Sequence, residues 1–243
     1  MKVLIIGESC KDIFNYGNCK RMCPEAPVPV FNPSEVIETG GMAMNTYNNV
    51  SSLLSTVDII TNDNWESITK TRFVDKRTNH MFMRLDKNDN MYGRIDLSTV
   101  DLDEYTAIIV SDYDKGFLTI EDLDYIGSNH KLTFLDTKKC LGPWSKRFSF
   151  IKINNIEYEK SINFIDDEMK NNLIITQGPK GCLYRGKNYS VPLVEIKDTS
   201  GAGDTFISAL CVKFCLTRDI DKSIRFANKC STKVVQKSGV AII

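Results

Sequence analysis

The stretch DTSGAGDTF, Asp198–Phe206, combines residue types that could bind and transfer a phosphoryl group. Gly201 and Gly203 flank Ala202, and glycines let successive backbone N–H groups approach one anion closely. The apolar run ISALCVKFCL follows, which predicts a buried helix whose N-terminal dipole adds to the attraction. Asp204 would repel an anion unless it has a chemical task. In phosphoryl transfer an aspartate can accept the proton of the attacking hydroxyl.

The alternative interpretation of Asp204 is a helix cap. Aspartates at helix N-termini accept hydrogen bonds from backbone N–H groups that lack a partner within the helix. The turn by itself leaves both interpretations open. The choice depends on which other polar residues the fold brings to the same place.

Aliphatic runs alternate with helical patterns and predict an α/β fold with a mainly parallel central sheet. KVLIIG, AIIVSDYDKG, LTFLDTKK, FSFIKINN and NLIITQGPKG each suit a buried strand followed by polar residues. The carboxyl ends of parallel strands share one edge of a sheet. We therefore expect one group of polar residues and glycines to gather with the glycine turn: Asp12, Asp112, Asp136, Lys138, Asn154, Thr176 and Gly178. This clustering favours the active-site interpretation of Asp204.

Two segments predict a smaller β structure outside the central sheet. Residues 20–33, KRMCPEAPVPVFNP, hold four of the seven prolines and suit an extended edge segment. The stretch TRFVDKRTNHMFMRLDKND alternates with period two, which places Met81, Met83 and Leu85 opposite Phe82, Arg84 and Asp86. On this basis Arg84 is either a clamp for a substrate or a solvated strand residue.

Several local signals indicate helices and turns. Gly40 and Gly41 are predicted to open a helix that runs to about Leu54. Asn45, one turn into this helix, either faces the same site as the glycine turn or is only an asparagine at the N-terminus of a helix that follows a loop. Thr119 and Asp122 resemble a capping box for a helix to about Ser128. CLYRGKNYSVPLVEI is predicted to form an antiparallel hairpin before the glycine turn. Asp12, expected in a loop after the first strand, is either a candidate for contacting substrate hydroxyls or a solvated acid.

Composition points to a globular protein that acts on small molecules. Lys plus Arg and Asp plus Glu number 31 each among 243 residues, so no net charge favours nucleic acid or anionic membrane. MKVLIIGES is too short for a signal peptide, and no apolar stretch approaches a membrane span, so we expect a cytoplasmic protein. The eight cysteines form no CxxC, and the only histidines are His80 and His130, which disfavours a structural zinc site.

Four motifs follow one another along the chain: a Gly-Gly followed by Asn45, N-x-x-E from Asn154 to Glu157, T-x-G-x-x-G from Thr176 to Gly181, and D-T-x-G-A-G-D from Asp198 to Asp204. Together they resemble the motifs of the ribokinase-like (PfkB) carbohydrate kinases. Their order and spacing make the resemblance specific. Within the family, RMCPEAPVPV, SDYDKG and RLD look most like segments of kinases of D-glycero-β-D-manno-heptose 7-phosphate, with Cys23 in place of a serine.

The resemblance runs from Gly7 to the C-terminal VVQKSGVAI and implies a ribokinase-like three-layer α/β fold. Residues 1–243 would form a single kinase domain, with a small β lid made by segments around 14–38 and 71–92. The chain is shorter than the family pattern between Leu54 and Thr71 and over 158–171, so we expect some sheet edge or helix cover to be lost. No H-x-G-H-like motif occurs, so we expect any nucleotidyl transfer to be carried out by another chain.

The resemblance also implies a role for each motif residue, with ATP and Mg²⁺ as cofactors. Asp204 would be the base, and the N–H groups of Gly201, Ala202 and Gly203 would form the anion hole. Asn154 and Glu157 would organise Mg²⁺ and the nucleotide phosphates through water. The ATP site would also include Lys138, Thr176, Gly178, Gly181 and Asn228. The sugar would be held by Asp12, Gly41, Asn45 and Arg84, with Lys115 for a distal phosphate.

The function implied is an ATP-dependent kinase of the anomeric hydroxyl of D-glycero-β-D-manno-heptose 7-phosphate, giving the 1,7-bisphosphate in ADP-heptose biosynthesis. One alternative is a related kinase of another sugar or sugar phosphate. Another is a non-catalytic nucleotide or sugar binder, although a binder has no need of a base at Asp204. The lid would exclude water and offers a homodimer interface, whereas no nucleic-acid or membrane partner is expected.

Overall fold

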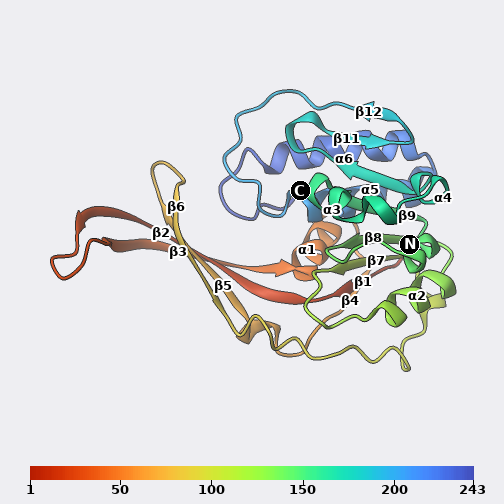
Figure 1. Ribbon diagram of the computed structural model, residues 1–243, viewed down its shortest axis with the longest axis horizontal. Helices are drawn as coiled ribbons and strands as arrows, with labels where there is room; N and C mark the ends of the chain where they lie inside the picture. The colour runs from red at the N-terminus through yellow and green to blue at the C-terminus, as the bar shows by residue number, and fades with distance from the viewer.

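An eight-stranded sheet forms the centre of the computed structural model, which describes all residues, 1–243 (Figure 1). The strand order is β12-β11-β10-β9-β8-β7-β1-β4, parallel from β4 to β10 and antiparallel at the other edge. The strands are β1 (Val3–Gly7), β4 (Val57–Ile60), β7 (Ala107–Asp112), β8 (Thr133–Thr137), β9 (Phe150–Asn154), β10 (Leu173–Thr176), β11 (Cys182–Tyr184) and β12 (Lys187–Tyr189).

Helices cover both faces of this sheet because its inner strands are apolar on both sides. Val3 and Ile5 point into a core shared with the first, fifth and sixth helices, and Leu4 and Ile6 into a core on the opposite face. The helices are α1 (Ala43–Leu53), α2 (Ile120–Asn129), α3 (Asn155–Ser161), α4 (Asp167–Lys170), α5 (Ala202–Thr217) and α6 (Ile220–Val234). Short 3₁₀ turns are η1 (Trp65–Ser67), η2 (Leu102–Glu104), η3 (Pro143–Arg147), η4 (Ile162–Phe164) and η5 (Gly178–Lys180). None of the helices combines the length and apolar character needed to cross a bilayer.

A second sheet of four strands projects from the body and forms the lid (Figure 1). Its order is β3-β2-β5-β6, with β2 (Ser9–Met22), β3 (Pro29–Met42), β5 (Thr69–Asp75) and β6 (Met81–Lys87). The proline-rich segment contributes to β3, which lies at the edge of the sheet as predicted, because proline cannot donate to a ladder on both sides. The lid strands begin earlier in the chain than predicted, at Ser9.

Strand pairing gives the lid two chemically different faces. On the inner face, Asp12 lies opposite Lys70, and Phe14 lies opposite Arg72, which is in turn paired with Arg84. This face turns toward the body, since Val240 packs against its aromatic cluster. The outer face carries the half-exposed apolar side chains of Val36, Met83 and Leu85.

The predicted fold class is confirmed, whereas several local predictions are wrong. Gly40 and Gly41 do not open a helix, because they pair with Lys11 and Cys10 as the end of β3, and α1 begins only at Ala43. The capping box of Thr119 and Asp122 is confirmed at the start of α2, which ends at Asn129.

Three further predictions need correction. Asp12 lies within the lid strand β2 rather than in a loop after β1. The predicted alternation in β6 fails at Met81. A register shift pairs Met81 with Val74, which places it on the inner face of the lid, whereas Met83 and Leu85 lie on the outer face. The predicted hairpin ends at Tyr189, and residues 190–201 form a loop.

Candidate active site

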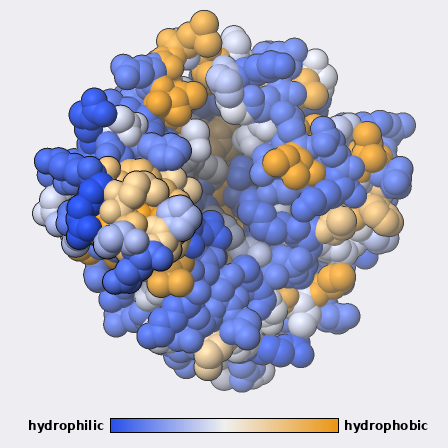
Figure 2. All heavy atoms as spheres, turned by 60° about the vertical axis from the view of Figure 1, so that its left-hand side comes forward, coloured by the Kyte–Doolittle hydropathy of each residue, from blue (hydrophilic) through white to orange (hydrophobic).

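A cavity of about 380 Å³ lies at the carboxyl edge of the central sheet. The view from the lid side shows the molecule hollowed between the lid and the body (Figure 2). The cavity brings together most of the residues predicted for the nucleotide and the phosphoryl group: Lys138, Asn154, Thr176, Gly178, Gly181, Gly201, Ala202, Gly203, Asp204 and Asn228. Its other wall is largely apolar and comes from Phe206, Val235 and the loop residues Val191, Pro192, Leu193, Val194 and Ile196.

The glycine turn leaves backbone donors free at the start of α5. Gly201 caps the helix with φ +76°, a left-handed conformation that favours glycine. The N–H groups of Gly201, Gly203 and Asp204 have no hydrogen-bond partner, whereas that of Ala202 donates to the carbonyl of Thr199 at 3.2 Å. Free N–H groups at a helix N-terminus form a site for an anion. A phosphoryl group could bind the N–H of Ala202 only by replacing its hydrogen bond to the carbonyl of Thr199.

The side chain of Asp204 makes no capping hydrogen bond. Its Oδ2 instead accepts from Nδ2 of Asn45 at 2.8 Å, and its Oδ1 accepts from the hydroxyl of Tyr113 at 2.8 Å. The residue is 4% exposed. Burial, followed by the charge of Asp136, raises the pKa of Asp204 to about 6, against the opposing effects of Asn45, Lys152 and Tyr113. At neutral pH the carboxylate is therefore ionised, and it is more basic than an ordinary aspartate.

A buried ion pair lies beside the turn. Nζ of Lys152 on β9 contacts Oδ2 of Asp136 on β8 at 2.6 Å, and both residues are almost fully buried. A Cβ on Gly203 would lie 2.7 Å from this ammonium, so the backbone of the turn passes directly over Lys152. The ammonium thus adds a fixed positive charge next to the free N–H groups.

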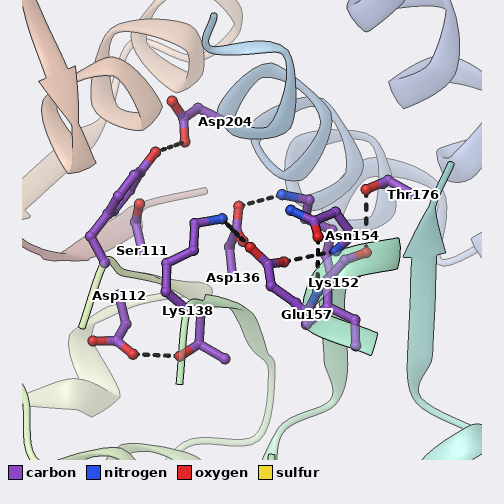
Figure 3. A network of polar contacts seen from close by, with 12 residues as sticks. Ser111, Asp112, Asp136, Lys138, Lys152, Asn154, Glu157, Thr176 and Asp204 are labelled. Carbon is purple, nitrogen blue, oxygen red and sulfur yellow. Dashed lines mark hydrogen bonds and ion pairs between the residues drawn. The ribbon is translucent and has the colours of Figure 1, made fainter. Parts of the chain in front are cut away.

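A second lysine joins this network (Figure 3). The ammonium of Lys138 contacts Glu157 and lies 4.0 Å from Oδ1 of Asp136, an atom that is buried without a hydrogen-bond partner. Burial lowers the pKa of Lys138, but the charges of Asp136 and Glu157 outweigh it, so the pKa is raised and the lysine stays charged.

Asn154 and Glu157 form a reciprocal capping box at the start of α3. The Glu157 N–H donates to Oδ1 of Asn154 at 3.0 Å, and the Asn154 N–H donates to Oε2 of Glu157 at 2.8 Å. Hard oxygen ligands suit Mg²⁺, yet Lys138 already occupies Oε1 of Glu157, and no group of three acidic, histidine or cysteine residues could hold a metal ion. These residues therefore fit Mg²⁺ held through water and nucleotide phosphates rather than by direct protein ligands.

Of the residues predicted to hold the sugar, Asp12 and Gly41 lie in contact at the base of the lid. Oδ1 of Asp12 contacts Nη1 of Arg72 at 2.5 Å, and the residue is 6% exposed. A Cβ on Gly41 would lie 2.3 Å from Oδ2 of Asp12, so the glycine provides the room for this carboxylate. Asn45 lies on α1, and its side-chain amide donates a hydrogen bond to the carboxylate of Asp204.

Arg84 and Lys115 are engaged elsewhere. Arg84 is exposed on the lid and bonds Asp86 through Nε and Nη2 at 2.8 and 2.7 Å. Lys115 contacts Oδ2 of Asp89 at 2.5 Å, and Lys70 contacts Oδ1 of the same carboxylate at 2.8 Å. Neither Arg84 nor Lys115 lines the cavity.

Asn228 and Thr176 line the cavity but also hold the protein together. Nδ2 of Asn228 donates to the carbonyl of Tyr189 at 2.8 Å, and the hydroxyl of Thr176 donates to the carbonyl of Ile153 at 3.2 Å. Both side chains therefore fix the walls of the predicted nucleotide site.

Sequence reasoning missed four residues of this site: Glu8, Arg72, Tyr113 and Lys152. Lys152 carried a usable signal, because a lysine inside the apolar strand FIKIN is unexpected unless it is paired. Arg72 carried none, since its position opposite Phe14 and beside Asp12 depends on the parallel pairing of β2 with β5.

Comparison with known proteins agrees with this fold. Residues 150–243 match the model of the pfkB family carbohydrate kinases. The Bifunctional protein HldE of Helicobacter pylori strain J99 is 27% identical over 297 aligned positions, covering 99% of this chain and 64% of that protein. The protein of the same name from a Nitratiruptor species is 24% identical over 99% of this chain and 62% of its own length. The chain thus spans less than two thirds of these relatives. An alignment longer than the chain means that they carry segments it lacks.

Solved structures share the whole fold at low sequence identity. Ribokinase of Thermotoga maritima superposes with a TM-score of 0.73 at 14% identity, covering 98% of this chain and 94% of that one. Phosphofructokinase-2 of Escherichia coli superposes with a TM-score of 0.70 at 12% identity, covering 99% of this chain and 94% of that one. The three-layer body and lid therefore define a ribokinase-like fold. The match of residues 150–243 to the family model and the alignments along the whole chain show that the protein is similar to the PfkB carbohydrate kinases.

Proposed function

We propose that this protein transfers the γ-phosphoryl group of ATP to the anomeric hydroxyl of D-glycero-β-D-manno-heptose 7-phosphate. The observation that carries the proposal is the buried carboxylate of Asp204 directly beside free N–H groups at the start of α5. A carboxylate at an anion site is unfavourable unless it takes a proton there. The acceptor hydroxyl would donate its proton to Asp204 as its oxygen bonds to the γ-phosphorus, and the bond from this phosphorus to the oxygen of the leaving ADP would break.

The donors around the turn suit the transferred group. The N–H groups of Gly201 and Gly203 and the ammonium of Lys152 would hold the oxygens of the phosphoryl group as charge develops on them. Donors fixed in advance need no reorganisation during the reaction, and one such donor is worth about 3–4 kcal/mol in other enzymes. Mg²⁺ held through water by Asn154 and Glu157 would neutralise charge on the nucleotide phosphates.

The apolar wall of the cavity suits a nucleobase. Leu193 is 90% exposed although it lines the cavity, and Ile196 is also exposed. Apolar side chains facing a cavity gain free energy when a flat apolar ligand covers them. Val235 and Asn228 lie along the same wall, so the adenine of ATP fits between the loop and α6.

The lid and the loop after β7 offer cations for the distal phosphate of the sugar. Lys70 and Lys115 converge on the single carboxylate of Asp89, and Arg72 lies on the same face of the lid as Lys70. Two ammonium groups on one carboxylate leave an excess positive charge that a phosphate could share. The segments RMCPEAPVPV, SDYDKG and RLD, which resemble heptose 7-phosphate kinases, lie in this lid and in the loop after β7.

The test measures turnover of a panel of sugars and sugar phosphates with ATP and Mg²⁺, using the wild type and Asp204→Asn. We expect the heptose 7-phosphate to be the preferred acceptor of the wild type. The variant should lose phosphoryl transfer by at least about a thousandfold while its Kd for ATP stays within a few fold, because the base touches the acceptor and not the nucleotide.

Other outcomes separate the alternatives. Preference for an unphosphorylated sugar would assign the site to a related kinase with another substrate. An absence of turnover with every acceptor, together with tight ATP binding, would instead favour a non-catalytic binder.

A further inference from the structure

The hydroxyl of Tyr113 is one of only two donors to the carboxylate of Asp204. Tyr113 follows β7, lines the cavity, and has the ammonium of Lys138 5.5 Å from its ring centre. Burial and the charge of Asp204 raise the pKa of the phenol well above its ordinary value. The hydroxyl therefore keeps its proton and can act only as a neutral donor to the carboxylate.

The loop that carries Tyr113 is held by a buried acid. Glu8, directly after β1, is fully buried, and its Oε2 and Oε1 accept the backbone N–H groups of Tyr113 and Lys115 at 2.9 and 3.0 Å. Asp114 between them has φ +56°, an uncommon conformation for a residue other than glycine. Burying a carboxylate is costly unless it is hydrogen-bonded, so both oxygens of Glu8 serve to fix this loop.

We propose that Tyr113 is a positioning residue for the base Asp204, and that Glu8 sets the place of Tyr113 through the backbone of the loop. This inference rests on the proposed kinase function and adds residues to the same site. Each carboxylate oxygen can accept two hydrogen bonds. Tyr113 occupies one position on Oδ1 and Asn45 one on Oδ2, so a position remains on each oxygen for the acceptor hydroxyl.

The Tyr113 bond also favours the ionised base. Donors to a carboxylate stabilise its charged form, and here they oppose burial and the negative charge of Asp136 on β8. The other charged groups facing Asp204 are Lys152 on β9 and Lys138 after β8, with Asp12 of the lid next to Tyr113. Loss of the Tyr113 hydroxyl leaves the opposing charges in place, so Asp204 should hold its proton to higher pH.

The experiment compares the pH profiles of kcat for the wild type and Tyr113→Phe. We expect kcat at pH 7 to fall by about tenfold to a hundredfold, the range for loss of a hydrogen bond to a charged group. The acid limb of the profile, where kcat falls as Asp204 becomes protonated, should move to higher pH. KM for ATP should stay within about twofold. A merely structural tyrosine would not shift the acid limb.

Tyr105→Phe is the matched control. Tyr105 also donates to an aspartate, Asp58 at 3.0 Å, but at the far edge of the sheet. Its loss should leave kcat and the pH profile unchanged. Glu8→Gln provides a second variant, because an amide cannot accept both N–H groups of the loop. We expect a shift of the acid limb in the same direction as with Tyr113→Phe.

A readout without turnover separates this inference from the proposed function. The carboxyl carbon of Asp204 can be titrated by NMR in the wild type, Tyr113→Phe and Glu8→Gln. We expect a higher pKa in both variants, even if every sugar fails as a substrate. An unchanged pKa would overturn the inference. A rise in kcat in Tyr113→Phe would also overturn it, since the tyrosine would then compete with the acceptor.

Discussion

Asp204 is a buried charge next to a site for anions, and its surroundings divide into two groups. Asn45, Tyr113 and Lys152 favour the ionised carboxylate, whereas burial and Asp136 favour the protonated form. The balance leaves a carboxylate that is charged at pH 7 and readily takes a proton, which suits a general base. This balance has a cost in stability that can be measured.

Asp204→Asn should raise the free energy of unfolding at pH 7. The native pKa of about 6, against an ordinary 3.8, corresponds to about 3 kcal/mol of destabilisation when the carboxylate is ionised in both states. Because the pKa is raised on folding, this cost is absent below about pH 4 and grows as pH rises to about 6. Urea unfolding should therefore show the variant to be more stable by about 1–3 kcal/mol at pH 7.

The same measurement at pH 4 provides the control, since the two proteins should then differ little. Equal stabilities at pH 7 would mean that Asp204 titrates as an ordinary aspartate. Its role as a base tuned by burial would then be wrong.

The turn before α5 depends on glycine for two separate reasons. Gly201 has a left-handed backbone, and a Cβ there would lie 2.5 Å from Nδ2 of Asn45, the donor to Asp204. Gly186, in the turn between β11 and β12, has a similar φ of +72° but no atom within 4 Å of a Cβ. The two glycines therefore separate backbone strain from a steric clash at the site.

Gly201→Ala should abolish most phosphoryl transfer, because the new methyl group would displace Asn45 from Asp204, the proposed base. Gly186→Ala should cost a similar backbone penalty of about 1 kcal/mol but keep full activity. Steady-state kinetics and urea unfolding of both variants test this expectation. Normal kinetics in Gly201→Ala would mean that the Asn45 contact is dispensable.

The whole molecule presents an apolar surface that its own fold does not cover. Val36, Met83 and Leu85 are each about half exposed on the outer face of the lid. Apolar groups gathered on one exposed face commonly mark an interface. We propose that two copies pair through this face.

Met83→Lys should weaken such a dimer, because pairing would bury an unpaired charge. Light scattering at several protein concentrations would show a dimer for the wild type and a larger monomer fraction for the variant. Leu216→Lys, on a residue that is 67% exposed at the end of α5, is the control and should behave as the wild type. A monomeric wild type at all concentrations would refute pairing through the lid.

Local patterns were enough to predict the body of the fold and many candidate residues. Buried strands appear as aliphatic runs, and their carboxyl ends lie together in any parallel sheet, so the convergence of Lys138, Asn154 and Thr176 near the glycine turn followed from chain order. The conformational freedom of Gly201 likewise depends on the residue type alone. These features are encoded over a few residues each.

The contacts that tune the site could not be predicted in this way, because they join distant parts of the chain. Asn45 and Asp204 are 159 residues apart, Tyr113 and Asp204 are 91 apart, and Asp12 and Arg72 are 60 apart. Such contacts depend on the pairing register of the lid and on how α1 packs against α5, and no short pattern specifies either. The turn at Asp204 could be found from its glycines, whereas the charge and orientation of its carboxylate depend on packing between separate layers.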